Sequence, residues 1–233
     1  YLAFGWFWYL ITLVPVIGVI QVGAQSMADR YTYVPLIGIF VILAWAVPEL
    51  LQKHATGKRL LAPAAVAIVL VWTILTYVQI GYWRNTVTLF EHACDVTENN
   101  HYMHQSVAGA YVEQGEFQKA MEHFEAAIRI EPNDGRILNS MAWFLATCSD
   151  EKYRNPRKAF EYAYRACERS GFNDPAQLDT LAAAYAALGK FDDAVATQKK
   201  AIALTPDQFK ADYEKRLGLY KAGKAFIEHL PNQ

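Results

Sequence analysis

The sequence predicts an all-α protein in which three transmembrane helices precede a helix–turn–helix solenoid of about three repeats and a C-terminal capping helix. Three observations support this fold class. Three long apolar stretches lie between Tyr1 and Trp83, the density of charged residues rises after Trp83, and a set of residues recurs at a regular interval in the second half.

The charged residues are distributed unevenly between the two halves of the chain. Residues 1–83 hold only six formal charges, whereas residues 84–233 hold all the others, a density that is normal for a soluble domain. We therefore predict a membrane domain over 1–83 and a water-exposed domain after it. The chain begins with Tyr1 inside an apolar run and shows no signal-peptide pattern. We interpret it as the C-terminal part of a longer protein.

The predicted spans lie at about 1–22, 33–51 and 60–82, and a helix needs roughly 20 residues to cross a bilayer. None of them shows the polar face that a helix on a soluble protein would carry. The segment between the second and third spans contains Lys53, Lys58 and Arg59 and no acid. The positive-inside rule therefore places it in the cytoplasm and predicts that everything after Trp83 lies on the extracytoplasmic side, in a periplasm or an organelle lumen.

Internal repetition dominates the second half. Ala108 recurs as Ala142 and again as Ala182, and the second interval is longer than the first, which predicts about five extra residues inside the middle unit. Six more positions recur at one constant offset: Tyr111, Gly115, Ala120, Phe124, Ala127 and Pro132 correspond to Tyr185, Gly189, Ala194, Gln198, Ala201 and Pro206. Small residues are expected where helices approach closely, glycine at the turn and proline at a helix end.

The step from Ala108 to Ala142 has the length of one repeat of about 34 residues, and with this residue set it resembles the tetratricopeptide-repeat (TPR) family. The resemblance implies a connecting half-repeat helix over 84–100, repeats over 101–134, 135–174 and 175–208, and a capping helix with a tail over 209–233. It also implies a protein or peptide partner. The concave face of the first helices would receive an extended or helical segment, and the expected contacts are Gln105, Asn139, Trp143, Leu178 and Asp179. The Lys and Asn residues of a carboxylate clamp are missing from these helices.

A second resemblance involves the segment from Gln25 to Gly38 and the later run from Tyr82 to Asn85. These residues are similar to the end of transmembrane TPR proteins in the glycosyltransferase-C superfamily, including the protein O-mannosyltransferase-like members. The resemblance implies a parent enzyme that uses a polyprenyl-phosphate sugar and presents its acceptor protein on the repeats. The family's catalytic acid lies upstream of this chain, so we predict no catalytic residue and no cofactor here.

Two interpretations of Arg30 remain open. The first is that it contacts the phosphate of a lipid-linked sugar, because the guanidinium group matches phosphate geometry. The second is that it is an interfacial arginine that reaches water beside Asp29. A membrane-anchored interaction module with a protein partner is the leading hypothesis for the whole chain. The C-terminal part of an O-glycosyltransferase is the alternative, and an assembly scaffold without a catalytic parent is a third.

Other kinds of site are not expected from the sequence. His101 and His104 are close enough to share a helix face, but no further ligand joins them at a typical spacing, so we predict no metal site. Cys94, Cys148 and Cys167 are interpreted as small buried side chains rather than as a disulfide pair with one spare thiol. The second half carries slightly more acidic than basic residues, which argues against nucleic-acid binding.

Overall fold

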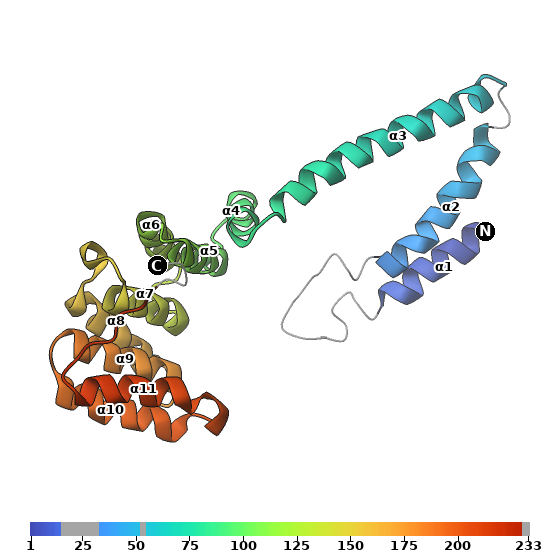
Figure 1. Cartoon of the computed structure of the whole chain (residues 1–233). Coiled ribbons are helices and arrows are strands. Elements are labelled where there is room, and N and C mark those ends of the chain that lie inside the picture. Colours follow the sequence, from blue (N-terminus) through green and yellow to red (C-terminus); the bar gives the residue numbers. More distant parts are fainter. Residues whose placement is uncertain (15–32, 52–54, 230–233) are drawn as a thin grey trace. The chain divides into compact units, whose positions relative to one another are not determined.

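The computed structural model describes residues 1–14, 33–51 and 55–229 (Figure 1). Within these ranges the chain forms eleven α-helices and two short 3₁₀ segments, and it contains no strand. The chain divides into two compact units, residues 1–78 and 79–233. The prediction of an all-α fold is therefore confirmed for the described residues.

The first unit contains α1 (Leu2–Leu13), α2 (Tyr33–Leu51) and most of α3 (Ala55–Tyr82). Helices α1 and α2 pack closely against each other, with glycines at their contact. A Cβ atom on Gly5 would lie only 2.5 Å from the carbonyl oxygen of Gly38, so a larger residue could not keep this backbone approach. The indole Nε1 of Trp8 donates a hydrogen bond to the carbonyl oxygen of Val34 at 2.9 Å and fixes the two helices further.

Two helices are long and apolar enough to cross a membrane, within Tyr33–Leu50 and Ala62–Tyr82. None of the Ala62–Tyr82 segment is buried in the structure, and at its end the Tyr82 ring stacks on His92 of α4 with the ring centres 3.6 Å apart. The expectation of three spans is supported only in part. Helix α1 is apolar but short, and residues 15–22 of that predicted span lie outside the described residues. Helix α3 begins at Ala55, earlier than the span predicted from Leu60.

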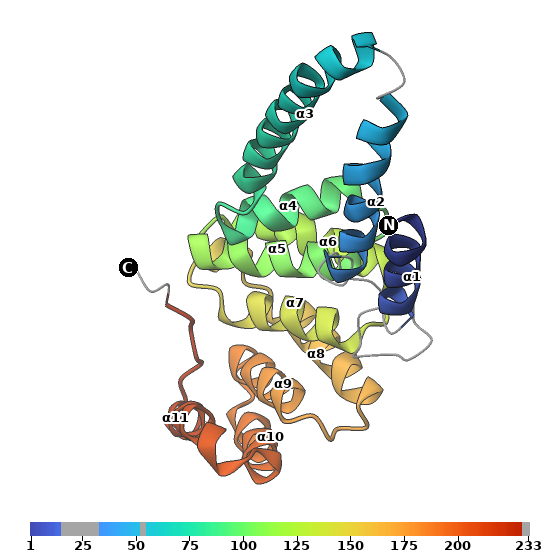
Figure 2. The same ribbon diagram turned by 90° about the vertical axis from the view of Figure 1, so that its right-hand side faces the viewer.

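The second unit contains eight further helices. They are α4 (Thr86–Val96), α5 (His101–Gln114), α6 (Phe117–Ile130), α7 (Gly135–Thr147), α8 (Pro156–Arg169), α9 (Pro175–Ala187), α10 (Phe191–Leu204) and α11 (Lys210–Lys221). Each packs against its neighbours in sequence, and α7 also contacts both α5 and α9 (Figures 1 and 2). The helices α5, α7 and α9 thus form one layer of a helical solenoid.

Local sequence explains where these helices begin and turn. Asn100, Asp134 and Asp174 each precede a helix, and their side chains accept hydrogen bonds from backbone N–H groups in its first turn. Such caps satisfy donors that have no partner inside the helix. Gly115 and Gly189 follow α5 and α9 with φ angles of 78° and 76°, a left-handed conformation that favours glycine. They let the chain reverse within a few residues.

Alanines occupy the contacts between the helices. Ala120, Ala127, Ala142 and Ala194 have no exposed surface, and Phe124 is 2% exposed. The link between α7 and α8 is longer than the others, since residues 148–155 connect these helices whereas residues 115–116 connect α5 and α6. It contains the 3₁₀ segment η2 (Glu151–Tyr153). The Tyr153 ring lies 5.7 Å from that of Phe117 and covers this edge of the core.

Candidate functional site

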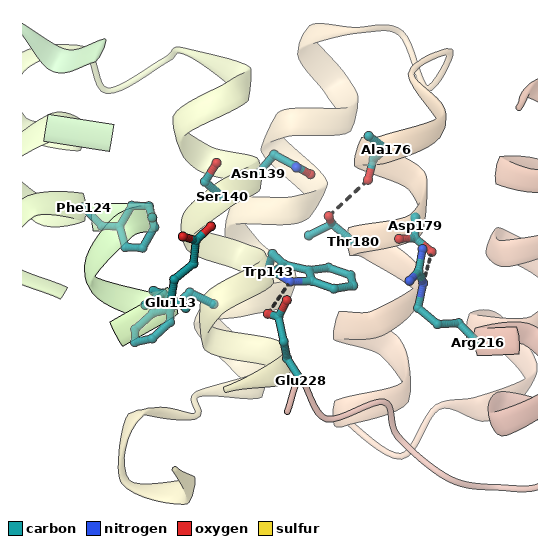
Figure 3. A pocket seen from close by; sticks show the side chains of 13 residues that line it. Glu113, Phe124, Asn139, Ser140, Trp143, Ala176, Asp179, Thr180, Arg216 and Glu228 are labelled. Atoms are coloured by element: carbon teal, nitrogen blue, oxygen red, sulfur yellow. Dashed lines mark hydrogen bonds and ion pairs between the residues drawn. The ribbon is translucent and has the colours of Figure 1, made fainter. Parts of the chain in front are cut away.

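A cavity of about 410 Å³ opens on the layer formed by α5, α7 and α9 (Figure 3). Glu113, Ser140 and Trp143 line it together with Arg216 from α11 and Glu228 from the C-terminal segment. A second hollow of about 530 Å³ lies between α4, α5 and α7 and shares Gly109, Phe124 and Ser140 with the first. The two hollows are adjacent along the solenoid, and we call them together the α5–α7–α9 groove.

The residues expected from the sequence occupy different places around this groove. Asn139, Trp143 and Asp179 line the first hollow, and Gln105 lines the second. Leu178 is a correction to the expected set, because its side chain is 1% exposed and packs in the core. It immediately precedes Asp179 on α9, and the turn of the helix points it away from the groove. The predicted phosphate contact Arg30 lies outside the described residues.

Asp179 is held by two groups of its own chain. Its Oδ1 accepts hydrogen bonds from Arg216 Nε at 2.8 Å and from Gln198 Nε2 at 2.6 Å. Burial raises the pKa of Asp179, while the neighbouring Arg216 and Gln198 act in the opposite direction. The two charges are almost fully enclosed, with side-chain exposures of 7% for Asp179 and 13% for Arg216. Both hydrogen bonds use Oδ1, so Asp179 positions Arg216 through that one carboxylate oxygen.

Arg216 is surrounded by aromatic rings. Its guanidinium carbon lies 5.4 Å from the ring centre of Trp143, 5.0 Å from that of Tyr213 and 5.6 Å from that of Phe226. A cation held over an aromatic face is attracted by the negative face of the ring. This arrangement places an arginine, ion-paired with Asp179, next to the Trp143 ring in the lining of the groove.

The C-terminal segment after α11 runs back along the solenoid to α7 (Figure 1). Its backbone is not helical over Lys224–His229, and Glu228 N donates to the carbonyl oxygen of Thr147 at 2.8 Å. The carboxylate of Glu228 accepts a hydrogen bond from Trp143 Nε1 at 2.8 Å (Figure 3). The ring of Phe226 lies 5.7 Å from that of Trp143. A non-helical segment of the protein itself thus contacts one end of the groove.

One polar atom beside the cavity lacks a partner. The Oδ1 atom of Asn139 is buried and accepts no hydrogen bond from any of the described residues. A buried acceptor without a donor lowers stability by about 1–3 kcal/mol. Asn139 lies on α7, one helical turn before Trp143.

The histidines of α5 face two different environments. His101 Nε2 lies 3.8 Å from Asp134 Oδ2, whereas His104 Nδ1 lies 3.0 Å from His123 Nδ1 of α6. Burial lowers the pKa of His104 and that of His123, and the neighbouring Arg129 adds to the effect on His104 while His104 adds to that on His123. All three cysteines are free thiols; Cys148 and Cys167 are buried and Cys94 is half-buried.

The fold and the groove together define a helical-repeat protein with a hollow along one layer of its solenoid. Two segments match family models described as tetratricopeptide repeat, residues 104–134 and 178–208. The first covers most of α5 and all of α6, and the second covers most of α9 and all of α10. The resemblance to tetratricopeptide repeats is confirmed by these two matches.

Proteins similar to the chain include two that bear the name of mannosyl-transferases. The Protein O-mannosyl-transferase Tmtc3 of Drosophila melanogaster is 25% identical over 142 residues, which cover 58% of this chain and 15% of the fly protein. The human Protein O-mannosyl-transferase TMTC3 is 26% identical over 108 residues, covering 46% of this chain and 12% of the human protein. An uncharacterized protein of Haemophilus influenzae is 26% identical over 89 residues, 38% of this chain and 49% of that protein. The resemblance to protein O-mannosyltransferase-like proteins is thus confirmed, and the chain spans only a small part of the fly and human proteins.

Sequence reasoning missed several residues of this site, among them the charged residues Arg216, Glu228 and Glu113. Arg216 and Glu228 lie beyond the last repeat, and nothing in the repeat pattern indicates that they return to α7. Glu113 lies on α5, in the position after Val112, and lines both hollows. A signal for the C-terminal segment does exist, because Phe226 and Ile227 are apolar residues in a stretch that follows the predicted cap.

Proposed function

We propose that the repeat unit binds an extended segment of a partner protein in the α5–α7–α9 groove. The observation that carries this proposal is the C-terminal segment, whose Phe226 and Glu228 contact Trp143. A protein surface that holds a non-helical segment of its own chain has contacts that can hold a similar segment of another protein. Asn139, whose Oδ1 has no hydrogen-bond partner among the described residues, lies in the lining of the same groove.

The contacts of this segment indicate which partner segment fits. Its aromatic ring packs beside Trp143 and Arg216, and its carboxylate two residues later accepts the indole N–H group. A partner segment should therefore be extended and carry an aromatic residue followed two positions later by an acid. Main-chain hydrogen bonds would add affinity, and these two side chains would set specificity.

The test uses the chain truncated after Ala222 and a synthetic peptide with the sequence of residues 223–229. We expect the truncated chain in detergent to bind this peptide, and the complete chain to bind it at least tenfold more weakly because its own segment competes. Replacing Phe226 or Glu228 of the peptide by alanine should weaken binding. In the protein, Trp143→Ala should do so, whereas Tyr164→Ala, an exposed aromatic on α8, should not. Absence of binding up to about 1 mM peptide would contradict the proposal.

A second candidate function concerns the larger protein to which this chain would belong. Its similarity to proteins named as protein O-mannosyl-transferases favours a membrane glycosyltransferase that uses a polyprenyl-phosphate sugar. In such an enzyme the groove would present the acceptor protein, and Arg30 would contact the phosphate of the donor.

Glycosyl transfer by the full-length protein tests this candidate. Arg30→Ala should lower the turnover of correctly inserted enzyme by orders of magnitude. Arg30→Lys should restore only part of it, because lysine keeps the charge but not the two-pronged geometry. Full activity of the alanine variant would remove Arg30 from the donor site, and full activity of the lysine variant would favour the interfacial interpretation.

A further inference from the structure

A cluster of metal-ligating side chains lies at the start of the second unit, away from the groove. Cys94 of α4, His104 of α5 and His123 of α6 place their ligand atoms within 4.8 Å of one another. The two histidines turn the same ring nitrogen toward each other, with Nδ1 atoms 3.0 Å apart. None of the three residues lines either hollow of the groove.

The three ligands come from three consecutive helices whose packing is fixed independently of them. Helix α4 packs on α5, and α5 packs on α6. The contact between α5 and α6 includes fully buried residues such as Ala108 and Ala120. The cluster is therefore held together by the repeat architecture, and a ligand would not have to assemble it from separate parts.

The donor set suits a borderline divalent cation. Imidazole nitrogen and thiolate sulfur are the ligands that Zn²⁺ binds most often, at about 2.0–2.1 Å and about 2.3 Å. In tetrahedral geometry two nitrogens at those distances are about 3.3 Å apart. The observed separation of 3.0 Å is close to this value, and small side-chain rotations bring the Cys94 sulfur into range. All three side chains are partly exposed, so an ion can reach them.

We propose that Cys94, His104 and His123 form a three-ligand site for Zn²⁺ that joins α4, α5 and α6, with a fourth coordination position open to water or to another ligand. Binding would replace the proton of the Cys94 thiol by the metal, which forms a Zn–S bond and releases H⁺ to solvent. It would also replace the contact between the two Nδ1 atoms by two metal–nitrogen bonds. The ion would link α4 to α5 and α6, which form the first complete repeat.

The competing explanation is a hydrogen bond between two neutral imidazoles with an inert thiol beside them. A pair of this kind needs one Nδ1–H donor and one bare Nδ1 acceptor, and it gains nothing from added metal. Metal binding and its dependence on Cys94 separate the two explanations.

The test uses the complete chain in detergent after removal of bound metal with a chelator. One equivalent of Zn²⁺ should bind and raise the thermal unfolding midpoint, and Co²⁺ should give visible bands of a four-coordinate ion with a thiolate charge-transfer band in the near ultraviolet. Cys94→Ser should abolish the charge-transfer band. His104→Ala and His123→Ala should weaken Zn²⁺ binding at least tenfold.

His101→Ala is the matched control, because His101 lies on the same helix three residues before His104 and faces Asp134 instead. It should bind Zn²⁺ like the unchanged chain. If His123→Ala does not fold, His123→Gln provides a polar replacement of similar size. Zn²⁺ binding that is equal in the His101 and His104 variants, or a Co²⁺ complex without a thiolate band, would overturn the proposal. Neither outcome depends on whether the groove binds a peptide.

Discussion

Single polar residues determine where the helices of the repeat unit begin, and Asp134 is the clearest example. Its Oδ1 accepts hydrogen bonds from the backbone N–H groups of Arg136 at 2.8 Å and Ile137 at 3.4 Å, and its Oδ2 pairs with the Arg136 guanidinium at 3.2 Å. Burial alone would raise the pKa of Asp134, but the hydrogen bonds and the charge of Arg136 outweigh it and lower that pKa below its ordinary value. The carboxylate form therefore stabilises the folded state.

We predict that Asp134→Ala weakens the first turn of α7 by about 1 kcal/mol, whereas Asp134→Asn retains most of the cap. Hydrogen exchange of the α7 amides, followed by mass spectrometry, measures this difference. Because the pKa is depressed on folding, the ionic contribution is complete above about pH 4 and is lost as the pH falls through the folded-state pKa. A difference between the Asp and Asn proteins that grows toward lower pH would contradict this sign.

At the scale of the elements, small residues lie at helix contacts in both units, but the two units are expected to be in different surroundings, one in lipid and one in water. The α1–α2 contact joins two apolar helices through Gly5 and Gly38, where no room exists for a Cβ atom. Apolar helices in lipid gain little from burying more apolar surface, so close backbone approach and packing hold them together. In the repeat unit, fully buried alanines such as Ala120 and Ala194 set the distance between helices in a water-exposed domain.

We predict that Gly38→Ala disrupts the α1–α2 contact by about 1–3 kcal/mol, the usual range for overpacking. Gly81→Ala is the control, because it also lies in an apolar helix and its added Cβ would meet no atom within 4 Å. Size-exclusion profiles of heated samples in detergent should show a lower thermal midpoint for Gly38→Ala and an unchanged one for Gly81→Ala. Equal midpoints would mean that the close glycine contact contributes nothing to stability.

A parallel prediction applies to the repeats. Ala120→Leu and Ala194→Leu insert three carbon atoms at positions without exposed surface and should destabilise the unit by about 1–3 kcal/mol. Lys199→Ala, on the exposed side of α10, should stay within about 0.5 kcal/mol. Circular dichroism during heating of the complete chain measures all three. Similar unfolding of the alanine-site variants and the lysine variant would contradict the assigned repeat register.

At the scale of the whole molecule, the chain joins an apolar helical unit to a polar repeat unit. The excess of positive charge at Lys53, Lys58 and Arg59 predicts that the repeat unit lies outside the cytoplasm. Protease added to the outer side of right-side-out membranes should then digest the repeat unit. Digestion only from the cytoplasmic side would contradict this orientation. Replacing the three residues by glutamine should increase the fraction of inverted molecules.

The fold is largely predictable from the sequence because helical repeats impose their packing on a few positions. The recurrence of Ala108 and Ala142 by itself indicates the helix pairs, and both residues have no exposed surface. The groove is predictable only in part. Inward and outward positions on α9 are hard to assign by sequence, so the sequence predicts Leu178 as a contact although it belongs to the core. Adjacent Asp179 does line the hollow.

Contacts between distant parts of the chain cannot be predicted in this way. His104, His123 and Cys94 lie close together although they belong to three different helices. Their spacing in the sequence does not match a short metal-binding motif and so does not indicate this cluster. The return of Glu228 to Trp143 links distant parts of the chain and follows no repeat period. Both depend on how the helices stack in three dimensions.

The docked C-terminal segment also determines how strongly any partner has to bind. It is covalently attached, so its concentration near the groove does not fall when the protein is diluted. A partner that binds at the same end of the groove can bind only those molecules in which the C-terminal segment is undocked. If the segment is docked in about 99% of molecules, the apparent dissociation constant rises about 100-fold, which is roughly 2.7 kcal/mol of binding free energy. Weakly binding segments would then be excluded by competition with the C-terminal segment, without any steric repulsion in the groove. Removal of a few C-terminal residues would widen the range of segments that the groove binds.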